Sequence, residues 1–580
     1  MSKDNHEIID MEHAVVEQPK SKKTKKREGD EADFSLAMID ENLVRAENED
    51  KLTVYLCFLI AAAAIAGFLF GYDTAVVGVA LPLIGNDLGK TLSASDQEII
   101  TAGTTIGAIF GSAILGAFAD KWGRKWCITI ADAFFTVGAI LIASSYSLAQ
   151  IIVGRLILGV GVGGAAVIAP LYITELAPTA VRGRCIGVNA LFIPVGQVVA
   201  DGIGAGVQNM KHGWRFLFAL GVVPSMIQLC LMHWLPESPR VSILKGKTEQ
   251  ARAAMRKVYQ DAPEAQIDFK IRVAEEYVAA TTKLQRDLTF SQRVSKIWKT
   301  KAYRRPIITV AGLQFFGQLT GFNALLYYAG TLFGLLGLSN PALGGLIPAG
   351  VNALFLFIGM CLVDRVGRRG LLVWCVPVMI AGLVWCVVGF YYMCKPTGGL
   401  LDTSYTYSTT NIGVVIGGIV FFVMGYGASY SHLIWYQSEF LALEIRAAGS
   451  AIATTTCWIA NLVVSVSYLS ELETLTPAGT YGLYLGFVTV GYVFVLFCFP
   501  ESKGLSIDEI AQVFHDGFGI KKSVEMRAEK DRLRAKWDKE NENTSVHDMA
   551  RKAKETAHLE FSQRPTRGFR DDLDSIAETV

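Results

Sequence analysis

The sequence predicts an all-α integral membrane protein with twelve transmembrane helices arranged as two pseudo-symmetric six-helix halves. Three observations lead to this fold class. The 580 residues are 51% hydrophobic and only 18% charged, whereas soluble domains carry about 25% charged residues. The apolar residues gather in runs long enough to cross a bilayer. Short motifs of the first half of the chain recur in the second half.

The apolar runs define the predicted helices. A helix needs about 20 mostly apolar residues to cross the hydrocarbon core. Strands of a transmembrane barrel alternate apolar and polar residues, but these runs are continuous, and in lipid a continuous run must form a helix to pair its backbone groups. The predicted spans are 53–84, 98–119, 126–146, 149–173, 185–207, 216–235, 306–333, 342–363, 371–393, 411–437, 447–470 and 479–499.

Charged residues lie mainly outside these runs and divide the chain. The expected parts are an N-terminal tail at 1–52, a first half at 53–235, a linker with short helices at 236–305, a second half at 306–499 and a C-terminal tail at 500–580. Lys and Arg are concentrated in the connections after even-numbered spans. The positive-inside rule therefore predicts a cytoplasmic linker and cytosolic termini, and we expect the plasma membrane.

Composition also excludes several classes of protein. A net charge of +1 lacks the basic excess of a nucleic-acid binder. The ten cysteines lie almost entirely within apolar runs and show no metal-ligand spacing, so no metal site is predicted. Because no nucleophile–base pair or cofactor motif is present, we expect neither an enzyme nor a bound cofactor. We expect a monomer.

Repeated motifs mark the cytoplasmic ends of the predicted spans. DKWGRK recurs as DRVGRR after 244 residues, whereas the pair Glu175 and Arg182 recurs as Glu439 and Arg446 after 264 residues, as does PES. Positive-inside topology alone requires Lys and Arg but no carboxylates. The alternative to simple topology is a latch of Arg–carboxylate pairs that closes in one transport state. The predicted latch residues are Asp120, Arg124, Glu175, Arg182, Asp364, Arg368, Glu439 and Arg446.

These motifs, with GFLFGYDTAVV at 67–77 and GQLTGFNALLYY at 317–328, resemble the sugar porter family of the major facilitator superfamily. Within that family, WYQSE at 435–439 and TPAGTYGLYLGF at 476–487 are most similar to fungal myo-inositol transporters. The resemblance covers roughly 53–515. It implies two halves that rock about a binding site near the midplane of the membrane.

Charged side chains inside spans are costly and are therefore functional candidates. Asp73 lies in the first span and Arg155 in the fourth. A carboxylate whose distance to an arginine changes can take up a proton on one side of the membrane and release it on the other. The resemblance also implies proton coupling by this pair, and a static ion pair is the alternative. The sequence assigns no role to Asp132 or Asp201.

A polyol or sugar requires amide groups and aromatic faces in a polar cavity. Gln318 and Asn323 are five residues apart, so they can share a cavity only if the helix breaks, and Gly317 or Gly321 could supply the break. Each amide could instead bond a neighbouring helix. The substrate-binding candidates are Gln197, Gln318, Asn323, Trp458 and Asn461.

Four further residues are candidates for a gate or for the cavity wall. Tyr327 and Tyr328 could form an outer gate, or belong to an aromatic belt at the membrane surface. Trp435 is a candidate for the cavity wall. His432 could bond substrate, titrate as a second proton carrier, or be a satisfied core histidine.

The sequence therefore predicts a secondary active transporter that imports a cyclic polyol, with myo-inositol as the expected substrate, by proton symport. One alternative is a hexose–proton symporter. Against it, Ala190, Gly317 and Cys457 stand where hexose members of the family carry polar residues. The other alternative is a non-transporting nutrient sensor that signals through its tails, and the intact Asp73 and Arg155 favour transport.

Overall fold

The computed structural model describes residues 53–540 apart from short gaps. These gaps are 179–180, several positions between 261 and 296, 339, 403, 442–444, 506 and 516. The predicted tail at 1–52 and the last forty residues of the predicted C-terminal tail lie outside the described residues. Residues 47–528 belong to one compact unit, and every helix described below lies within it except the last part of α23.

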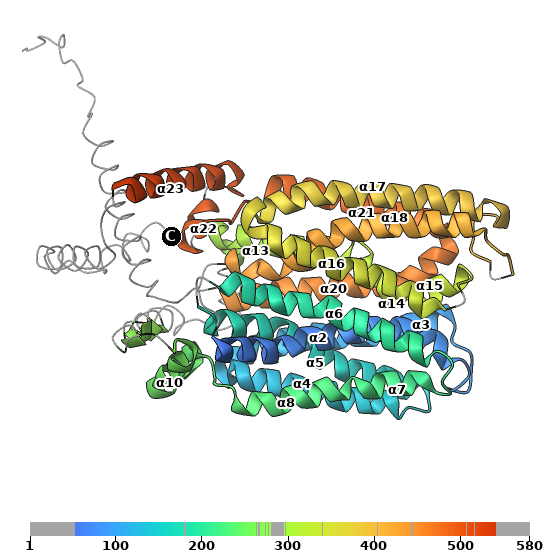
Figure 1. Cartoon of the computed structure of the whole chain (residues 1–580), viewed down its shortest axis with the longest axis horizontal. Coiled ribbons are helices and arrows are strands. Elements are labelled where there is room, and N and C mark those ends of the chain that lie inside the picture. Colours follow the sequence, from blue (N-terminus) through green and yellow to red (C-terminus); the bar gives the residue numbers. More distant parts are fainter. Residues whose placement is uncertain are drawn as a thin grey trace, which may run out of the picture. The chain divides into compact units, whose positions relative to one another are not determined.

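The first half contains six spans that begin and end close to the predicted positions (Figure 1). The sixth span is formed by two helices that meet at Gly221. The helices are α2 (Val54–Ile84), α3 (Ala94–Trp122), α4 (Arg124–Ala143), α5 (Leu148–Leu176), α6 (Arg182–Val207), α7 (Gly213–Leu220) and α8 (Val222–Trp234).

The second half follows the same plan but contains more interruptions. Short helices outside the spans are α9 (Pro239–Leu244), α10 (Thr248–Val258) and α22 (Ile507–Val513), and α23 covers Ile520–Glu540. The second half comprises α13 (Lys301–Gln318), α14 (Phe322–Tyr327), α15 (Ala329–Leu335), α16 (Pro341–Val366), α17 (Arg368–Cys394), η1 (Lys395–Thr397), α18 (Thr409–Ala428), α19 (Tyr430–Leu433), η2 (Ile434–Glu439), α20 (Arg446–Thr474) and α21 (Thr476–Cys498).

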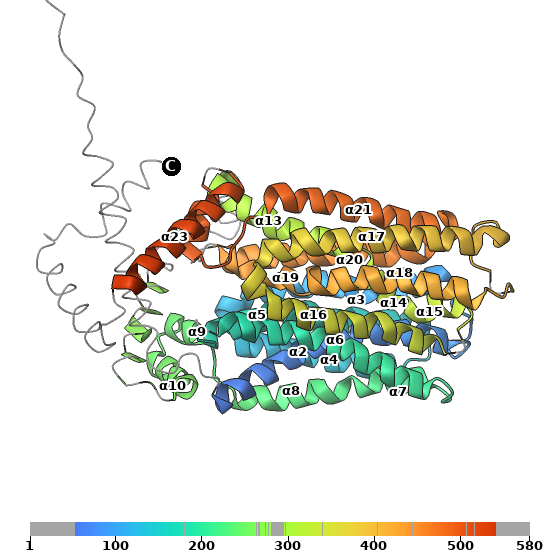
Figure 2. The same cartoon turned by 45° about the horizontal axis from the view of Figure 1, so that its top comes forward.

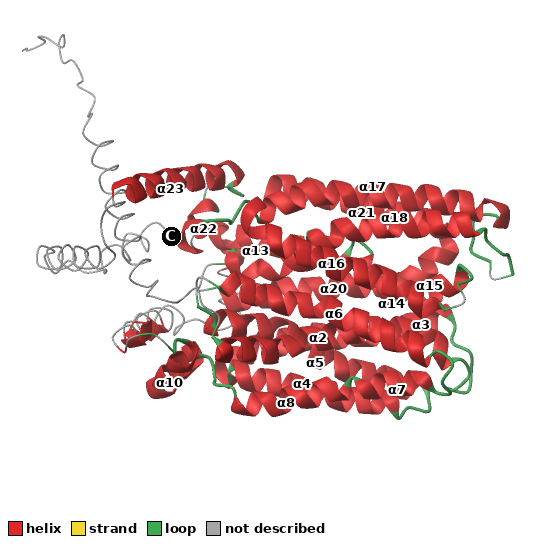
Figure 3. Ribbon diagram, viewed as in Figure 1, coloured by secondary structure: helices red, strands yellow, loops and turns green. Residues whose placement is uncertain are grey.

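The described part of the chain is helical and contains no strand (Figure 3). By length and composition, eleven of its helical segments can cross a membrane. The remaining predicted span, 306–333, which is the seventh along the chain, is divided into α13, α14 and α15. Gly321 stands at the first break with a φ of 82°, a conformation that glycine adopts without steric cost. The predicted all-α, two-half membrane fold is thus confirmed, with a broken seventh span.

The spanning helices run side by side within the compact unit (Figure 2). Helices α4, α7 and α8 lie on one flank, and α17, α18 and α21 lie on the other. The two halves meet where α3 packs against α20 and where α6 packs against α16. We call the end that carries α9 and α10 the linker end, and the opposite end the far end.

Glycines allow helices to approach closely both within one half and between the two halves. Added to Gly71 of α2, a Cβ atom would lie 1.8 Å from the carbonyl oxygen of Ile193, within the first half. Added to Gly78, it would lie 2.2 Å from the carbonyl oxygen of Leu326 in α14, across the two halves. A backbone neighbour cannot move aside like a flexible side chain, so both positions require glycine.

The far-end loops are tied together by the carboxylate of Asp87. It accepts a hydrogen bond from Trp214 Nε1 at 2.7 Å and lies 2.6 Å from His212 Nδ1. These contacts hold the pKa of Asp87 below its ordinary value. The first extracytoplasmic connection predicted by the sequence is thereby fastened to the connection before the sixth span.

We expect acid to weaken this tie. A carboxyl whose folded pKa is lowered stabilises the fold above its unfolded pKa, and the contribution is lost as pH falls through the folded pKa. The wild type should therefore lose stability below about pH 4 more steeply than Asp87→Asn. Because Asp87 is only partly buried and its partner His212 is exposed, the difference should not exceed about 1 kcal/mol. Thermal unfolding in detergent across this pH range measures it, and parallel pH profiles would contradict the expectation.

Candidate functional site

The predicted ion pair between α2 and α5 is formed. Arg155 Nη1 lies 2.5 Å from Asp73 Oδ1, and both side chains are buried. Arg155 Nε also donates to the carbonyl oxygen of Ile100 at 3.4 Å, and the guanidinium lies 5.9 Å from the ring centre of Phe218. A charge this deeply buried needs a partner, because removing either one leaves the other desolvated and unpaired. Proton transfer by this pair remains a prediction.

A network of polar side chains lies at the break between α13 and α14. Gln318 Oε1 accepts hydrogen bonds from Asn323 Nδ2 at 2.5 Å and from Asn461 Nδ2 at 2.9 Å. Tyr327 donates to Asn461 Oδ1 at 3.1 Å, and Gln318 Nε2 donates to Cys457 Sγ at 3.0 Å. The interruption at Gly321 is what brings Asn323 back to Gln318. Hydroxyl groups of a polyol could replace any of these amide contacts.

Gln197 does not belong to this network. It lies in α6 of the first half, where its Oε1 accepts a hydrogen bond from Asn352 Nδ2 of α16 at 3.3 Å. Both side chains are buried. Asn352 was not among the candidates predicted from the sequence, although a single Asn in an apolar run carries the same signal as Asn461. The Gln318 network thus belongs to the second half, whereas the bond between Gln197 and Asn352 joins the two halves.

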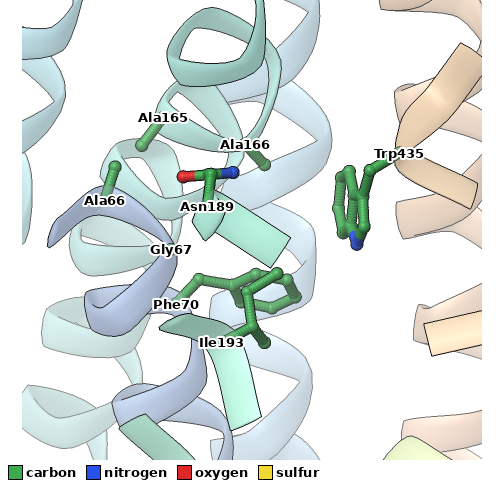
Figure 4. Close-up of a pocket in the computed structure, with 8 residues that line it drawn as sticks. All are labelled: Ala66, Gly67, Phe70, Ala165, Ala166, Asn189, Ile193 and Trp435. Atoms are coloured by element: carbon green, nitrogen blue, oxygen red, sulfur yellow. The ribbon is translucent and has the colours of Figure 1, made fainter. Parts of the chain in front are cut away.

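Aromatic rings join the halves beside these amides. Phe70 of α2 has its ring centre 6.1 Å from that of Trp435 and 5.3 Å from that of Trp458, both in the second half. Figure 4 shows Trp435 on one side of a pocket and its other lining residues opposite. The lining consists of Ala66, Gly67, Phe70, Ala165, Ala166, Asn189, Ile193 and Trp435. Phe70 was missed because nothing separates it from other apolar residues in the sequence.

The two candidate gate tyrosines lie inside the protein. Tyr327 is 5% exposed and Tyr328 is fully buried, so neither belongs to an aromatic belt at the lipid surface. Tyr328 donates to the carbonyl oxygen of Ser465 at 2.5 Å and stacks on Tyr468. The gate interpretation fits this position between the helices, and the belt interpretation is wrong.

His432 of α19 is also buried. Its ring lies edge-on to that of Tyr436, with centres 6.3 Å apart. It packs so closely on Gly359 of α16 that a Cβ there would lie 2.6 Å from its Cε1. Among the described residues, no hydrogen bond joins His432 to the network around Gln318. The structure therefore places it in the core of the second half.

The predicted latch residues pair as two equivalent clusters at the linker end. Arg124 lies 2.7 Å from carboxylate oxygens of both Asp120 and Glu175. In the second half, Arg368 lies 3.4 Å from Asp364 and 3.2 Å from Glu439.

The remaining latch residues begin helices: Arg182 is the first residue of α6, and Arg446 is the first residue of α20. Each cluster ties helices of one half together, and its opening during transport remains a prediction.

The glutamates of the repeated PES motif complete these clusters. Glu237 Oε1 accepts hydrogen bonds from the backbone N–H groups of Arg124 and Lys125, at 2.9 and 3.2 Å. Glu501 likewise accepts from the backbone of Arg368, at 3.0 Å. A carboxylate at these positions satisfies the free donors at the N-termini of α4 and α17. The repeat of PES is visible in the sequence, but these two glutamates were not among the predicted latch residues.

A bundle of two six-span halves, with amides from both halves near its centre and a buried ion pair, is the architecture of an alternating-access transporter. Residues 59–514 match the model of the family described as Sugar (and other) transporter. The chain belongs to this sugar porter family of the major facilitator superfamily. Within the described residues no cluster of three or more His, Cys, Asp or Glu could hold a metal ion.

Similar proteins agree with this assignment. The chain is 66% identical to Myo-inositol transporter 3 of Cryptococcus neoformans, covering 92% of this chain and 89% of that one. It is 34% identical to Myo-inositol transporter 2 of Schizosaccharomyces pombe, covering 85% and 88%. The fold also matches the proton:xylose symporter XylE, with a TM-score of 0.67 at 24% identity over 79% of this chain and 99% of that one. The protein is therefore a multi-pass membrane transporter of a polyol or sugar and not an enzyme.

Proposed function

We propose that this transporter imports myo-inositol by proton symport. The observation that carries the proposal is the identity of 66–67%, over nine-tenths of the chain, to transporters named for myo-inositol. The site suits such a substrate, because a cyclic polyol presents hydroxyl groups around its rim and an apolar face. Amides of Gln318, Asn323 and Asn461 can bond the hydroxyls, and the tryptophan rings can cover the face.

Coupling to protons is supported by the arrangement of α2. Phe70 contacts the tryptophans of the second half, and Asp73, three residues further, pairs with Arg155. Residues three apart lie on neighbouring positions of one helix face. A displacement of α2 caused by substrate contact at Phe70 would therefore change the distance between Asp73 and Arg155. A longer distance favours protonation of Asp73, and a shorter one favours its release.

We further propose that the linker end faces the cytoplasm and that the protein resides in the plasma membrane with cytosolic termini. The Lys and Arg residues of the predicted even-numbered connections support this orientation. Substrate would then enter from the far end and leave at the linker end, with the proton moving inward beside it.

Uptake of labelled myo-inositol and labelled glucose into cells lacking their own inositol transport tests the function. We expect saturable, concentrative uptake of inositol that collapses with a protonophore. Uptake of glucose without inositol would instead establish a hexose symporter. Accumulation that ignores the protonophore would contradict proton coupling, and absence of any uptake at normal surface expression would favour a sensor.

A further inference from the structure

Asp201 of α6 is a buried carboxyl with no place in the site described above. It is 2% exposed, and its Oδ2 has no hydrogen-bond partner among the described residues. Burying a carboxyl group without a partner is unfavourable by several kcal/mol. Ionisable residues inside membrane helices usually face the interior and serve the transported species. The position of Asp201 therefore needs a functional explanation.

The carboxyl lies at the contact between the two halves. Asp201 is one helix turn beyond Gln197 towards the far end, on the same face of α6, and Gln197 bonds Asn352 of α16. A Cβ added to Gly345 of α16 would lie 3.4 Å from Asp201 Oδ1 and 3.3 Å from the Cβ of Ala329. Asp201 thus faces α16 and the first residue of α15, directly after the candidate gate tyrosines.

The internal repeat supports a role in binding. The offset of 264 residues that relates Glu175 to Glu439 and one PES motif to the other brackets the fifth and eleventh spans. The same offset relates Gln197 to Asn461 and Asp201 to Ser465. Asn461 belongs to the polar network, and the carbonyl of Ser465 accepts the hydrogen bond of Tyr328. Asp201 therefore occupies, in the first half, the register that carries gate and substrate contacts in the second.

We propose that Asp201 is a specificity-determining residue whose carboxylate receives two adjacent hydroxyl groups of the incoming polyol, one helix turn outside Gln197. This assignment rests on the proposed function. A carboxylate offers two acceptor oxygens and no donor, and hydrogen bonds to a charged acceptor are stronger than neutral ones.

The same chemistry discriminates between substrate classes. Every ring carbon of an inositol carries a hydroxyl donor, whereas the ring of a pyranose includes an oxygen atom, which is only an acceptor. When the ring oxygen of a pyranose lies against the carboxylate, two acceptors face each other and no hydrogen bond forms. The site would therefore bind a pyranose more weakly than an inositol. Withdrawal of α15 from Gly345 and Asp201 would open the site to substrate from the far end.

The test compares uptake by Asp201→Asn and by the wild type. The substrates are myo-inositol, singly deoxygenated inositols and glucose. We expect the KM for myo-inositol to rise about tenfold or more, as for loss of a hydrogen bond to a charged group, and the preference over glucose to shrink. The accumulation ratio should stay unchanged, because Asp73 and Arg155 are intact. In the variant, removal of one hydroxyl from the substrate should cost less affinity than in the wild type.

Asp132→Asn is the matched control. Asp132 is as buried as Asp201 and its Oδ2 is likewise unpartnered among the described residues. It lies on α4, however, which packs against α5, α7 and α8 of the same half, and Ser225 of α8 donates to its carbonyl oxygen at 3.0 Å. Its KM and its preference for inositol should equal those of the wild type. Gly345→Ala provides an independent variant: its Cβ would touch the Asp201 carboxylate at 3.4 Å and crowd the Cβ of Ala329 at 3.3 Å. It narrows the space beside the carboxylate without removing it, and it too should raise the KM.

An unchanged KM in Asp201→Asn would overturn the assignment, as would equal losses for inositol and glucose. Loss of accumulation with normal KM would instead make Asp201 a proton carrier and also overturn it. If Asp201→Asn does not reach the cell surface, an unchanged KM in Gly345→Ala decides against the assignment. A wild type that transports glucose but no inositol would refute the proposed function itself, before any variant is compared.

Discussion

Asp73→Asn is expected to abolish uphill uptake while downhill exchange of substrate continues. The amide keeps the shape of the side chain beside Arg155 but cannot take up and release the proton. Without that step, the free energy of the proton gradient no longer reaches the substrate, and the inside-to-outside ratio should fall to about one. Steady-state accumulation measures the first property, and exchange of labelled against unlabelled substrate at equal concentrations measures the second.

The control for this experiment is Asp73→Glu, which retains a titratable carboxyl and should keep part of the accumulation. Asp132→Asn removes another buried carboxyl of the first half and should accumulate substrate normally. If Asp73→Asn still concentrated substrate in a manner sensitive to a protonophore, the ion pair of 2.5 Å would be structural and the proton would travel elsewhere.

Gly78→Ala is expected to hold the far end of the transporter open. The added Cβ would lie 2.2 Å from the carbonyl oxygen of Leu326, and a Cβ at Gly330 would meet the carbonyl oxygen of Gly78 at 2.4 Å. In both cases the added Cβ would overlap a backbone carbonyl, which cannot move aside. Helix α2 and the α14–α15 segment must therefore move apart. Overpacking of this kind is unfavourable by about 1–3 kcal/mol, which should lower the ratio of closed to open transporter, and with it uptake, by about 5- to 150-fold.

Accessibility of the interior from the far end provides the measurement. A cysteine introduced at Thr331, which bonds Gln97 of the other half at 3.0 Å, should react faster with a maleimide in purified Gly78→Ala than in the parent protein. Gly202→Ala is a suitable control, since a Cβ there meets nothing within 4 Å. Gly71→Ala should fail differently, through poor folding, because its clash lies inside one half. Equal labelling rates in the parent and in Gly78→Ala would contradict the gating role.

The transmembrane helices could be predicted from the sequence because backbone groups in lipid can be paired in few ways. Long apolar runs must form helices, so the spans were predicted closely, and the spacing of Gln318 and Asn323 even required the break that Gly321 provides. The latch pairs followed from charges repeated at fixed offsets. Contacts between the halves were not predictable in this way. Phe70 and Gly78 look like ordinary span residues, and their importance depends on neighbours hundreds of positions away.

The same limit applies within the second half. The tenth predicted span ends in the short segments α19 and η2, which no residue pattern indicated, and this interruption sets the position of Trp435. His432 carried three interpretations in the sequence, and only its packing against Gly359 distinguishes the core from the network around Gln318. Whether a polar residue of a span binds substrate or only packs in the core depends on its neighbours in the fold, which its residue type does not reveal.

Helix α2 combines three contacts on one continuous rod: Phe70 against the tryptophans, Asp73 against Arg155, and Gly78 against α14. A rigid rod transmits a tilt along its full length. Its contacts therefore cannot change one at a time without loss of packing at another. The consequence concerns stoichiometry: cycles in which the ion pair opens without cargo, or cargo crosses without the ion pair, should be rare. Softening the middle of α2 should appear first as proton leak, before any loss of turnover.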